Sequence, residues 1–373
     1  MKKYDFIIVG SGLFGLTFNY LAKQKGYTCC IIERRPHIGG NIYTPIIDNI
    51  PIHKYGAHIF HTTDKKIWDL TCSLCEMVPF INSPIAIYKN EVYNLPFNMN
   101  TFSKIFNVIK PSEVEVKLNE EINKFGFKTP KNFEEQAISL VGETIYNKLI
   151  KEYTEKQWGK DCKELSPEII KRIPLRLFYD NNYFEDLYQG IPKNGYNELI
   201  NNLIGDTEVI FDDYLKNKEY FNNLGRYVIY TGPIDEYFGF SQGHLEWRSL
   251  EFKTTKHNIS NFQGNAVVNY TSHDVPYTRT IEHKFFDKLG DGFKKNITYV
   301  TEEYPINWEK GKEPFYPLLT AENLAILDKY NALKELEKNV IFGGRLGSYK
   351  YYDMDDTMIN AIKTFEEIVS KDE

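Results

Sequence analysis

The sequence predicts an α/β fold in which an α/β domain is interrupted by a helical region and by an antiparallel β-sheet. Three observations predict it. Residues 4–33 hold an apolar strand, a glycine-rich turn, a helix and a second strand. Residues 101–158 repeat apolar side chains at a helical period, whereas residues 243–308 alternate as strands do. Strand patterns at 226–231 and 340–345 return the chain to the first domain.

The first strand, residues 4–9, stops at the turn Gly10-Ser11-Gly12-Leu13-Phe14-Gly15. A helix is expected at 13–25, closed by Gly26, and a second strand at 28–32 ends on Glu33. Strand, turn, helix, strand and acid form the dinucleotide-binding fingerprint in its required order. The alternative is an ordinary βαβ turn, and the combined pattern argues against it.

Each glycine of this turn has a physical role. Gly10 permits the tight turn, Gly12 lets the backbone approach a pyrophosphate, and Gly15 lets the helix pack close to the strand. The helix N-terminus offers unpaired N–H groups and a partial positive charge to phosphates. Glu33 is placed to accept hydrogen bonds from a ribose hydroxyl.

A second glycine pair, Gly39-Gly40 followed by Asn41, comes six residues after Glu33. This pattern resembles the extended signature of FAD-binding proteins of the amine-oxidase and disulfide-reductase type, which have a Rossmann-like domain. The pair lets the backbone approach the same pyrophosphate from its other side. Arg34 and Arg35 suggest a 2′-phosphate and hence NADP, but Glu33 would repel that phosphate.

Composition limits the class of protein. A chain of 373 residues accommodates two or three domains. The sequence has no run of about 18 apolar residues to span a membrane, and its early core strand argues against a cleavable signal peptide. The net charge of −6 and the pI near 5.9 argue against nucleic acid as the main partner. Any anion site must therefore be a local cluster of Arg or Lys.

The cysteines and histidines predict neither disulfides nor a metal. Five cysteines, an odd number, suit a reducing compartment, and a cytoplasmic location is expected. Cys72 and Cys75 form a lone C-x-x-C, which we expect to pack on one helix face rather than act as a redox dithiol. His53, His58 and His61 have no carboxylate at helical ligand spacing, so no metal site is expected.

Further elements follow from local signals. Residues 81–95 read as two short strands around the turn Lys89-Asn90. Ser112 with Glu115 and Asn132 with Glu135 resemble capping boxes, and a helix is expected over 133–150. Other helices are expected at 64–77, 196–203 and 355–369, other strands at 208–211, 245–252, 266–270 and 298–300, and a mobile loop at 165–173.

These elements divide into three expected domains. The FAD-binding domain is discontinuous, with residues 1–78, 191–240 and 320–373. Residues 98–165 form the helical domain. Residues 79–97, 166–190 and 241–319 form the antiparallel sheet domain on the substrate side.

Motifs from every segment together resemble the bacterial UDP-galactopyranose mutase family. They are residues 10–15, Gly56-Ala57-His58-Ile59-Phe60-His61-Thr62, Tyr153-Thr154-Glu155-Lys156-Gln157-Trp158-Gly159, Arg172-Ile173-Pro174, Val275-Pro276-Tyr277-Thr278-Arg279 and Tyr349-Lys350-Tyr351-Tyr352-Asp353-Met354. The resemblance spans nearly the whole chain. It implies an FAD domain, a helical domain and an antiparallel sheet.

The resemblance also implies an activity. Members of the family interconvert UDP-galactopyranose and UDP-galactofuranose through a covalent adduct of the sugar with N5 of reduced FAD, with no net redox change. The implied partners are the UDP-sugar, an external reductant such as NAD(P)H and a second copy of the chain, with no membrane insertion. The implied process is galactofuranose supply for cell-wall polysaccharide.

Residue roles follow from the same resemblance. The implied catalytic residues are Arg172, Arg279 and His58, of which the arginines bind the diphosphate and His58 lies beside the flavin. Tyr153 is expected to stack on uracil and Trp158 to cover the sugar. The implied substrate-binding residues are Asn82, Tyr153, Thr154, Trp158, Arg172, Tyr183, Asn269, Arg279, Tyr316 and Tyr351. The implied cofactor-binding residues are Gly10, Gly12, Leu13, Phe14, Gly15, Glu33, Arg34, Gly40, Asn41, His58, Ile59, Gly232, Gly344, Arg345, Tyr352, Asp353 and Met354.

Two other functions stay open for this fold. An FAD-dependent oxidoreductase would pass electrons from its substrate to oxygen or NAD. A non-catalytic protein like the GDP-dissociation inhibitors would bind a protein partner and would be colourless. The visible absorbance of the purified protein separates this binder from both enzymes.

Overall fold

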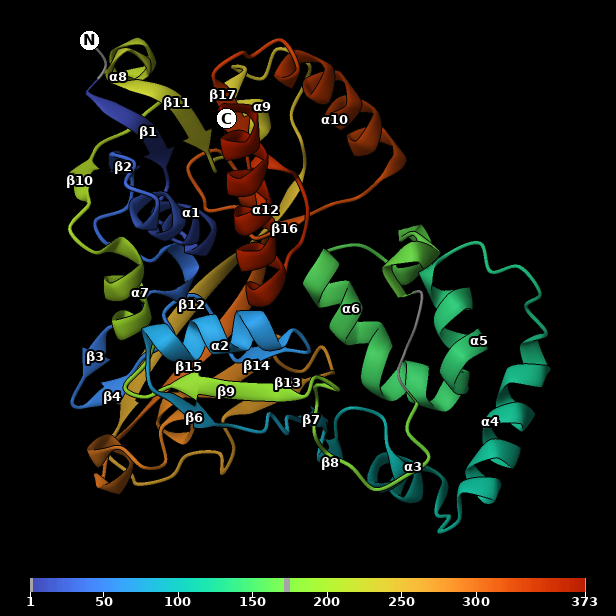
Figure 1. Ribbon diagram of the computed structural model, residues 1–373. Coiled ribbons are helices and arrows are strands. Elements are labelled where there is room, and N and C mark those ends of the chain that lie inside the picture. The colour runs from blue at the N-terminus through green and yellow to red at the C-terminus, as the bar shows by residue number, and fades with distance from the viewer. Residues whose placement is uncertain (1–2, 171–174, 373) are drawn as a thin grey trace. The chain divides into compact units, whose positions relative to one another are not determined.

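The computed structural model describes residues 3–170 and 175–372. The chain divides into two compact units, and it leaves and re-enters the first unit twice (Figure 1). Unit 1 consists of Met1–Phe80, Asp186–Trp247 and Pro314–Glu373, and unit 2 of Ile81–Glu185 and Arg248–Glu313. The finer boundaries between a helical domain and a sheet domain stay a prediction.

Unit 1 is built on a parallel sheet with the strand order β10-β2-β1-β11-β17. Its strands are β1 (Tyr4–Val9), β2 (Cys29–Glu33), β10 (Glu208–Phe211), β11 (Gly225–Tyr230) and β17 (Val340–Phe342). Val9 is in register with both Ile32 and Tyr230, so the carboxyl ends of these strands meet at one edge. Strand order reverses between β1 and β11, which is where open α/β sheets bind ligands. The expected Rossmann-like fold is confirmed.

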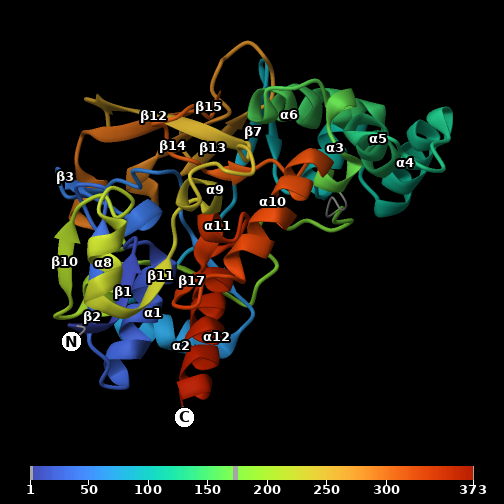
Figure 2. The same ribbon diagram turned by 90° about the horizontal axis from the view of Figure 1, so that it is seen from above.

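Helices pack against this sheet through apolar side chains. The α12 helix (Met354–Asp372) lies beside α1 (Leu13–Gln24) in both views, and α7 (Asn197–Ile204) also contacts α1 (Figures 1 and 2). Phe18 of α1 meets Phe365 of α12 edge to face, with ring centroids 5.5 Å apart. These side chains belong to one buried cluster, which fixes the N-terminus of α1 against the sheet.

Smaller elements complete unit 1. They are η1 (Gly40–Ile42), β3 (Ile46–Ile47), β4 (Ile50–Pro51), β5 (Phe60–Thr62), α2 (Lys65–Leu74), β6 (Met77–Pro79), β9 (Tyr188–Pro192), α8 (Lys218–Leu224), α9 (Ile234–Tyr237), β16 (Tyr316–Pro317), α10 (Ala321–Lys334) and α11 (Gly344–Gly347). Within the described residues, no helix is both long and apolar enough to cross a membrane.

Unit 2 combines helices with a second sheet. Its helices are α3 (Met99–Phe106), α4 (Pro111–Phe125), α5 (Phe133–Ile145), the π-helix η2 (Tyr146–Ile150), α6 (Lys151–Trp158) and the 3₁₀ turns η3 (Cys162–Glu164), η4 (Pro167–Ile170), η5 (His283–Phe286) and η6 (Asp291–Lys294). Its strands are β7 (Ile85–Tyr88), β8 (Glu91–Asn94), β12 (Trp247–His257), β13 (Val267–Tyr270), β14 (Arg279–Glu282) and β15 (Thr298–Asn307). Figure 2 shows β12, β15, β14, β13 and β7 side by side.

Four local expectations are corrected. The α4 helix begins at Pro111, so Ser112 already lies in its first turn and Glu113, not Glu115, accepts from the N–H of Lys110. The helix expected over 133–150 breaks at Gly142, whose φ is +78°, and continues as η2. The second sheet is not purely antiparallel, because β13 runs parallel to β7, a strand from a distant segment, whereas its pairing with β14 is antiparallel. Of the C-x-x-C pair, Cys72 is exposed and Cys75 is buried, so the two do not pack together on one helix face.

Candidate functional site

The turn between β1 and α1 needs glycine at two positions for reasons internal to the protein. Gly10 has a φ of +99°, and a Cβ there would lie 2.3 Å from the Oγ1 atom of Thr231. A Cβ on Gly15 would lie 2.2 Å from the carbonyl oxygen of Gly10. Both contacts are shorter than atoms tolerate, so these glycines let α1 and β11 approach the turn.

Gly12 is different. Its φ is −70°, which any residue adopts, and a Cβ would have no protein neighbour within 4 Å beyond its adjacent residues. A Cβ on Gly40 would lie 2.7 Å from the Cα of Gly12, so the Gly39-Gly40 pair packs directly against the turn of residues 10–15. Gly12 is the N-cap of α1 and supplies no side-chain cap to its first N–H groups. This open, backbone-lined position fits the pyrophosphate of a dinucleotide.

Glu33 is buried at the end of β2 and is bound by the turn itself. One carboxylate oxygen accepts from the N–H of Ser11 at 2.8 Å and from its hydroxyl. The other accepts from the N–H of Arg35 at 2.7 Å. The second oxygen, Oε1, accepts only this one hydrogen bond and retains a lone pair for a ribose hydroxyl. The acid therefore also holds the glycine turn in place.

The ends of β11 and β17 reach the same turn. The hydroxyl of Thr231 donates to the carbonyl oxygen of Val9 at 2.6 Å. A Cβ on Gly343 would lie 2.2 Å from the Cζ atom of Phe14, so the strand end packs on the first turn of α1. The predicted residue Gly344 follows, with a φ of +71°. Gly232 lies against the ring of Tyr230, whose hydroxyl would be 2.6 Å from an added Cβ.

The segment after α11 gathers polar and aromatic groups in unit 1. The Arg345 guanidinium lies 4.4 Å from the Tyr351 ring centroid, and its Nε donates to the carbonyl oxygen of Tyr352 at 2.7 Å. The Tyr351 hydroxyl donates to Asp353 at 3.1 Å. The rings of Tyr316 and Tyr351 stack at 6.0 Å. The structure thus brings together five of the predicted residues.

His58 lies in the loop before β5. Its Nδ1 lies 2.8 Å from the carbonyl oxygen of Gly56, so Nδ1 carries the proton that it donates. The N–H of His58 donates to Nδ1 of His53, and its carbonyl oxygen accepts from the Tyr196 hydroxyl. The contact with Gly56 sets the tautomer and the orientation of the ring, and the two backbone contacts hold the loop in place.

Of the remaining predicted cofactor residues, the polar ones have protein partners and the apolar ones are buried or half-buried. Arg34 forms an ion pair with Glu236, with Nη1 and Oε1 3.4 Å apart. The side-chain oxygen of Asn41 accepts from Arg35 at 3.0 Å. Three predicted apolar residues lie at element edges: Leu13 and Ile59 are buried, and Met354 is half-buried at the start of α12.

In unit 2, α6 carries a group of predicted substrate residues. Thr154 is buried, whereas Tyr153 and Trp158 are half-buried. The helix ends at Gly159, whose φ of +66° suits a helix C-terminus. Arg248 caps this end, because its Nε donates to the carbonyl oxygen of Gln157 at 2.8 Å.

Arg279 begins β14, where it lies in register between Asn269 on β13 and Glu303 on β15. Its Nε donates to the buried carboxylate of Glu303 at 2.9 Å. The amide of Asn269 donates to the carbonyl oxygen of Ile85 at 3.4 Å. The Arg279 side chain is a quarter exposed, and its ion pair with Glu303 orients the guanidinium.

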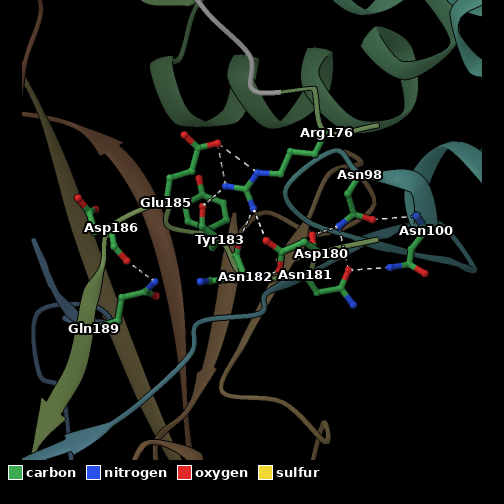
Figure 3. Close-up of polar contacts among 10 residues, drawn as sticks. All are labelled: Asn98, Asn100, Arg176, Asp180, Asn181, Asn182, Tyr183, Glu185, Asp186 and Gln189. Carbon is green, nitrogen blue, oxygen red and sulfur yellow. Dashed lines mark hydrogen bonds and ion pairs between the residues drawn. The ribbon is translucent and has the colours of Figure 1, made fainter. Parts of the chain in front are cut away.

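Figure 3 shows how a buried arginine organises the segment that contains Tyr183. The Arg176 guanidinium donates to the carbonyl oxygens of Asn182 and Tyr183 and pairs with Glu185 at 3.3 Å. The N–H of Tyr183 donates to the carbonyl oxygen of Asn82 at 2.8 Å. Two predicted residues, Asn82 and Tyr183, are therefore adjacent.

The remaining predicted residue, Arg172, lies outside the described residues. Sequence reasoning assigned no role to Ser11, Lys156, Arg176 and Glu303, which hold predicted site residues in place. Ser11 and Lys156 lie inside the motifs and were detectable there. Among the residues that the structure describes, no group of three or more His, Cys, Asp or Glu is arranged to hold a metal ion.

Comparison with known proteins gives the family. The sequence profile described as UDP-galactopyranose mutase matches residues 148–351, and that of an NAD(P)-binding Rossmann-like domain matches residues 8–73. The chain is 37% identical to "Probable UDP-galactopyranose mutase" of Klebsiella pneumoniae, covering 99% of this chain and 96% of that protein. It is 33% identical to "dTDP-fucopyranose mutase" of Escherichia coli, covering 96% of both.

Solved structures show the same fold. A crystal structure of reduced UDP-galactopyranose mutase matches with a TM-score of 0.76 and 14% identity, covering 98% of this chain and 96% of that chain. A putative protoporphyrinogen oxidase from Exiguobacterium matches with a TM-score of 0.62 and 11% identity, covering 99% of each chain. At these identities the likeness concerns fold alone. The sequence relatives go further, and with them this chain belongs to the UDP-galactopyranose mutase family of flavoproteins.

Proposed function

We propose that this chain interconverts UDP-galactopyranose and UDP-galactofuranose, with FAD in its reduced form and with no net redox change. The match of the family profile to residues 148–351 carries the proposal. That range includes α6, Arg279 and the Tyr316 and Tyr351 pair, all outside the nucleotide fingerprint. An oxidoreductase with the same fold needs the fingerprint but not these residues.

The charges of the chain support a diphosphate substrate. A protein of net charge −6 must bind a diphosphate through local cations. Arg279 is held by Glu303 with its guanidinium partly exposed, and a planar fork suits phosphate oxygens. Arg172 is proposed as the second diphosphate partner. Both would stabilise the UDP leaving group, an effect typically worth about 10²–10³ in rate for each donor.

The flavin supplies the chemistry that no side chain offers. When bound and reduced, FAD would supply a nucleophilic N5 nitrogen for the ring contraction. The chain positions that cofactor through the backbone at Gly12 and Gly40. His58, with its proton on Nδ1, is proposed to lie beside the flavin ring. Tyr153 and Trp158 are proposed to contact uracil and sugar.

The setting of the reaction is also proposed. We expect an external reductant such as NAD(P)H, a homodimer, a cytoplasmic location and a product that enters cell-wall polysaccharide. These proposals rest on the family resemblance.

The test is chromatography of UDP-galactofuranose incubated with purified protein, which follows its conversion to UDP-galactopyranose. Dithionite-reduced protein should convert it and oxidised protein should not. Equal rates in the two redox states would contradict the role of reduced flavin. Stoichiometric peroxide or NADH formed from the substrate would instead identify an oxidoreductase.

A second substrate class is favoured by one observation, the 33% identity to the dTDP-fucopyranose mutase. The same assay with dTDP-fucofuranose tests it. A higher kcat/KM for the dTDP-sugar than for the UDP-sugar would reassign the substrate and leave the reaction class unchanged.

A further inference from the structure

Lys156 of α6 has an unusual environment. Its Nζ donates to four backbone carbonyl oxygens, those of Tyr270 at 2.8 Å, Ser272 at 2.8 Å, Val275 at 3.2 Å and Tyr277 at 3.0 Å. All four acceptors belong to residues 270–278, which comprise the last residue of β13 and the loop that leads to β14 and which we call the 270–278 segment. The ammonium therefore occupies a carbonyl cage of the kind that suits a monovalent cation.

The hydrogen bonds of this cage prevent the Lys156 ammonium from binding the substrate directly. An ammonium has three N–H groups, and four carbonyl oxygens already share them. Burial lowers the pKa of Lys156 to about 8, so the charged form with all three N–H groups still dominates at neutral pH. The cation at this position in the Tyr153–Gly159 motif is thus committed to the protein and not to the diphosphate.

The cage spans both ends of the 270–278 segment. Tyr270 follows the predicted substrate residue Asn269 on β13, and Tyr277 precedes Arg279 on β14 by two residues. Tyr153 lies on α6 itself, one helical turn before Lys156. A single side chain therefore connects the element expected to bind uracil with the strand expected to bind diphosphate.

Two acidic side chains of α6 reinforce the connection. Glu152 accepts from the N–H of His273, and Glu155 pairs with the ring of His273 at 3.0 Å. Thr271 donates from its hydroxyl to the carbonyl oxygen of Lys148 at 2.8 Å. These contacts involve only Thr271 and His273. Among the contacts described, those of Lys156 alone reach both ends of the 270–278 segment.

We propose that Lys156 is a positioning residue for the nucleotide part of the substrate, because its ammonium holds α6 and the 270–278 segment at a fixed distance. The inference rests on the proposed function. It explains why a lysine stands within the motif between Tyr153 and Trp158 without contacting substrate. The two family motifs that are distant in sequence meet at this one ammonium.

The test substitutes Lys156→Met, which keeps an unbranched apolar stem one atom shorter than lysine and removes every donor. The expected result is a rise of about tenfold or more in the dissociation constant of UDP, measured by calorimetry, since small misplacement of binding groups is costly. KM for the UDP-sugar should rise more than kcat falls. Flavin content should stay at the wild-type level, because the predicted cofactor residues belong to unit 1.

Lys284 gives a matched control. It is a buried lysine of unit 2 whose Nζ also donates to backbone carbonyl oxygens, those of Ser260, Lys295 and Ile297, none of which is a predicted site residue. Lys284→Met should lower Tm, as Lys156→Met should, but should change UDP affinity less than twofold. If Lys156→Met does not fold, Lys156→Gln, which keeps two N–H donors, replaces it with a smaller expected rise.

The outcomes are distinct. Native UDP affinity in a folded Lys156 variant overturns the inference, and so does an equal loss of affinity in Lys284→Met, because the effect would then be general destabilisation. A wild-type protein that neither binds UDP nor converts the sugar overturns the proposed function itself. A selective loss of affinity at Lys156 supports the inference.

Discussion

Arg279 on β14 donates from its Nε to the Oε2 atom of Glu303 on β15, 2.9 Å away, and the two residues are also register partners in the sheet. The Glu303 side chain is only 2% exposed, whereas that of Arg279 is 25% exposed. The buried Glu303 carboxylate acts on the Arg279 guanidinium. It neutralises the inner edge of the guanidinium and fixes the direction of its other N–H groups.

Glu303→Ala should therefore weaken both substrate binding and stability. We expect about tenfold or weaker UDP affinity, because the guanidinium loses its fixed orientation. The free energy of unfolding should fall by about 2–3 kcal/mol, somewhat less than for a fully buried pair because Arg279 is partly exposed. Calorimetry and denaturant titration measure the two quantities.

Glu302→Ala is the control for that change. Glu302 is the neighbouring residue on β15, and its carboxylate pairs with the exposed Lys253 at 3.6 Å. UDP affinity should be unchanged in this variant. Equal losses of affinity in both variants would contradict the assignment of Glu303.

Gly12→Ala should fold normally but lose FAD. Its φ is compatible with alanine, and the added Cβ meets no protein atom within 4 Å apart from those of its chain neighbours, so only a bound pyrophosphate opposes it. We expect at least about tenfold weaker FAD binding, a loss of about 1.4 kcal/mol. Visible absorbance of the purified protein and Tm of the apoprotein provide the measurement.

Gly15→Ala should behave in the opposite way. Its Cβ would lie 2.2 Å from the backbone oxygen of Gly10, so the apoprotein itself should lose stability.

A Gly12→Ala protein that retains its full yellow colour would show that the pyrophosphate does not lie at this turn.

Arg176→Ala should release the segment that contains Tyr183. The change leaves the carbonyl oxygens of Asn182 and Tyr183 without their buried donor, and we expect a loss of about 2–4 kcal/mol. Glu185→Ala removes an ion-pair partner that is 74% exposed, and it should cost less than about 1 kcal/mol. Hydrogen exchange over 176–185 measures both, and similar exchange in the two variants would contradict the assigned order.

His283 should make stability depend on pH. Burial lowers its pKa to about 3, against about 6.5 in an unfolded chain. Between these values the unfolded state binds the additional proton, so the free energy of unfolding rises with pH. The contribution of His283 is fully present above about pH 6.5 and falls by about 1.4 kcal/mol for each pH unit below it.

The non-titrating variant His283→Gln isolates this effect. The stability difference between wild type and variant should shrink in favour of the variant as pH falls from 7.5 to 5. The contact of His283 with the Thr301 hydroxyl at 2.6 Å makes some constant cost expected at every pH. A difference that does not vary with pH would show that the ring is not held neutral.

The sequence by itself determined the elements whose causes are local. The glycine turn at 10–15, the cap of α5 by Asn132 and the hairpin at Lys89 are set by backbone freedom and by hydrogen bonds between near neighbours. The same locality limits such reasoning. Ser112 is a residue type that is favoured at helix N-caps, but the helix begins one residue earlier, at Pro111.

Only the tertiary structure decided which groups distant in sequence form ion pairs and hydrogen bonds with one another. The pairing of Arg279 with Glu303, the binding of Glu33 by Ser11 and the cage around Lys156 join residues from separate elements. The parallel pairing of β13 with β7 and the break at Gly142 likewise depend on packing across the chain. Backbone conformation is governed by neighbours in sequence, whereas the orientation of a charged side chain is governed by neighbours in space, and these are known only when the chain has folded.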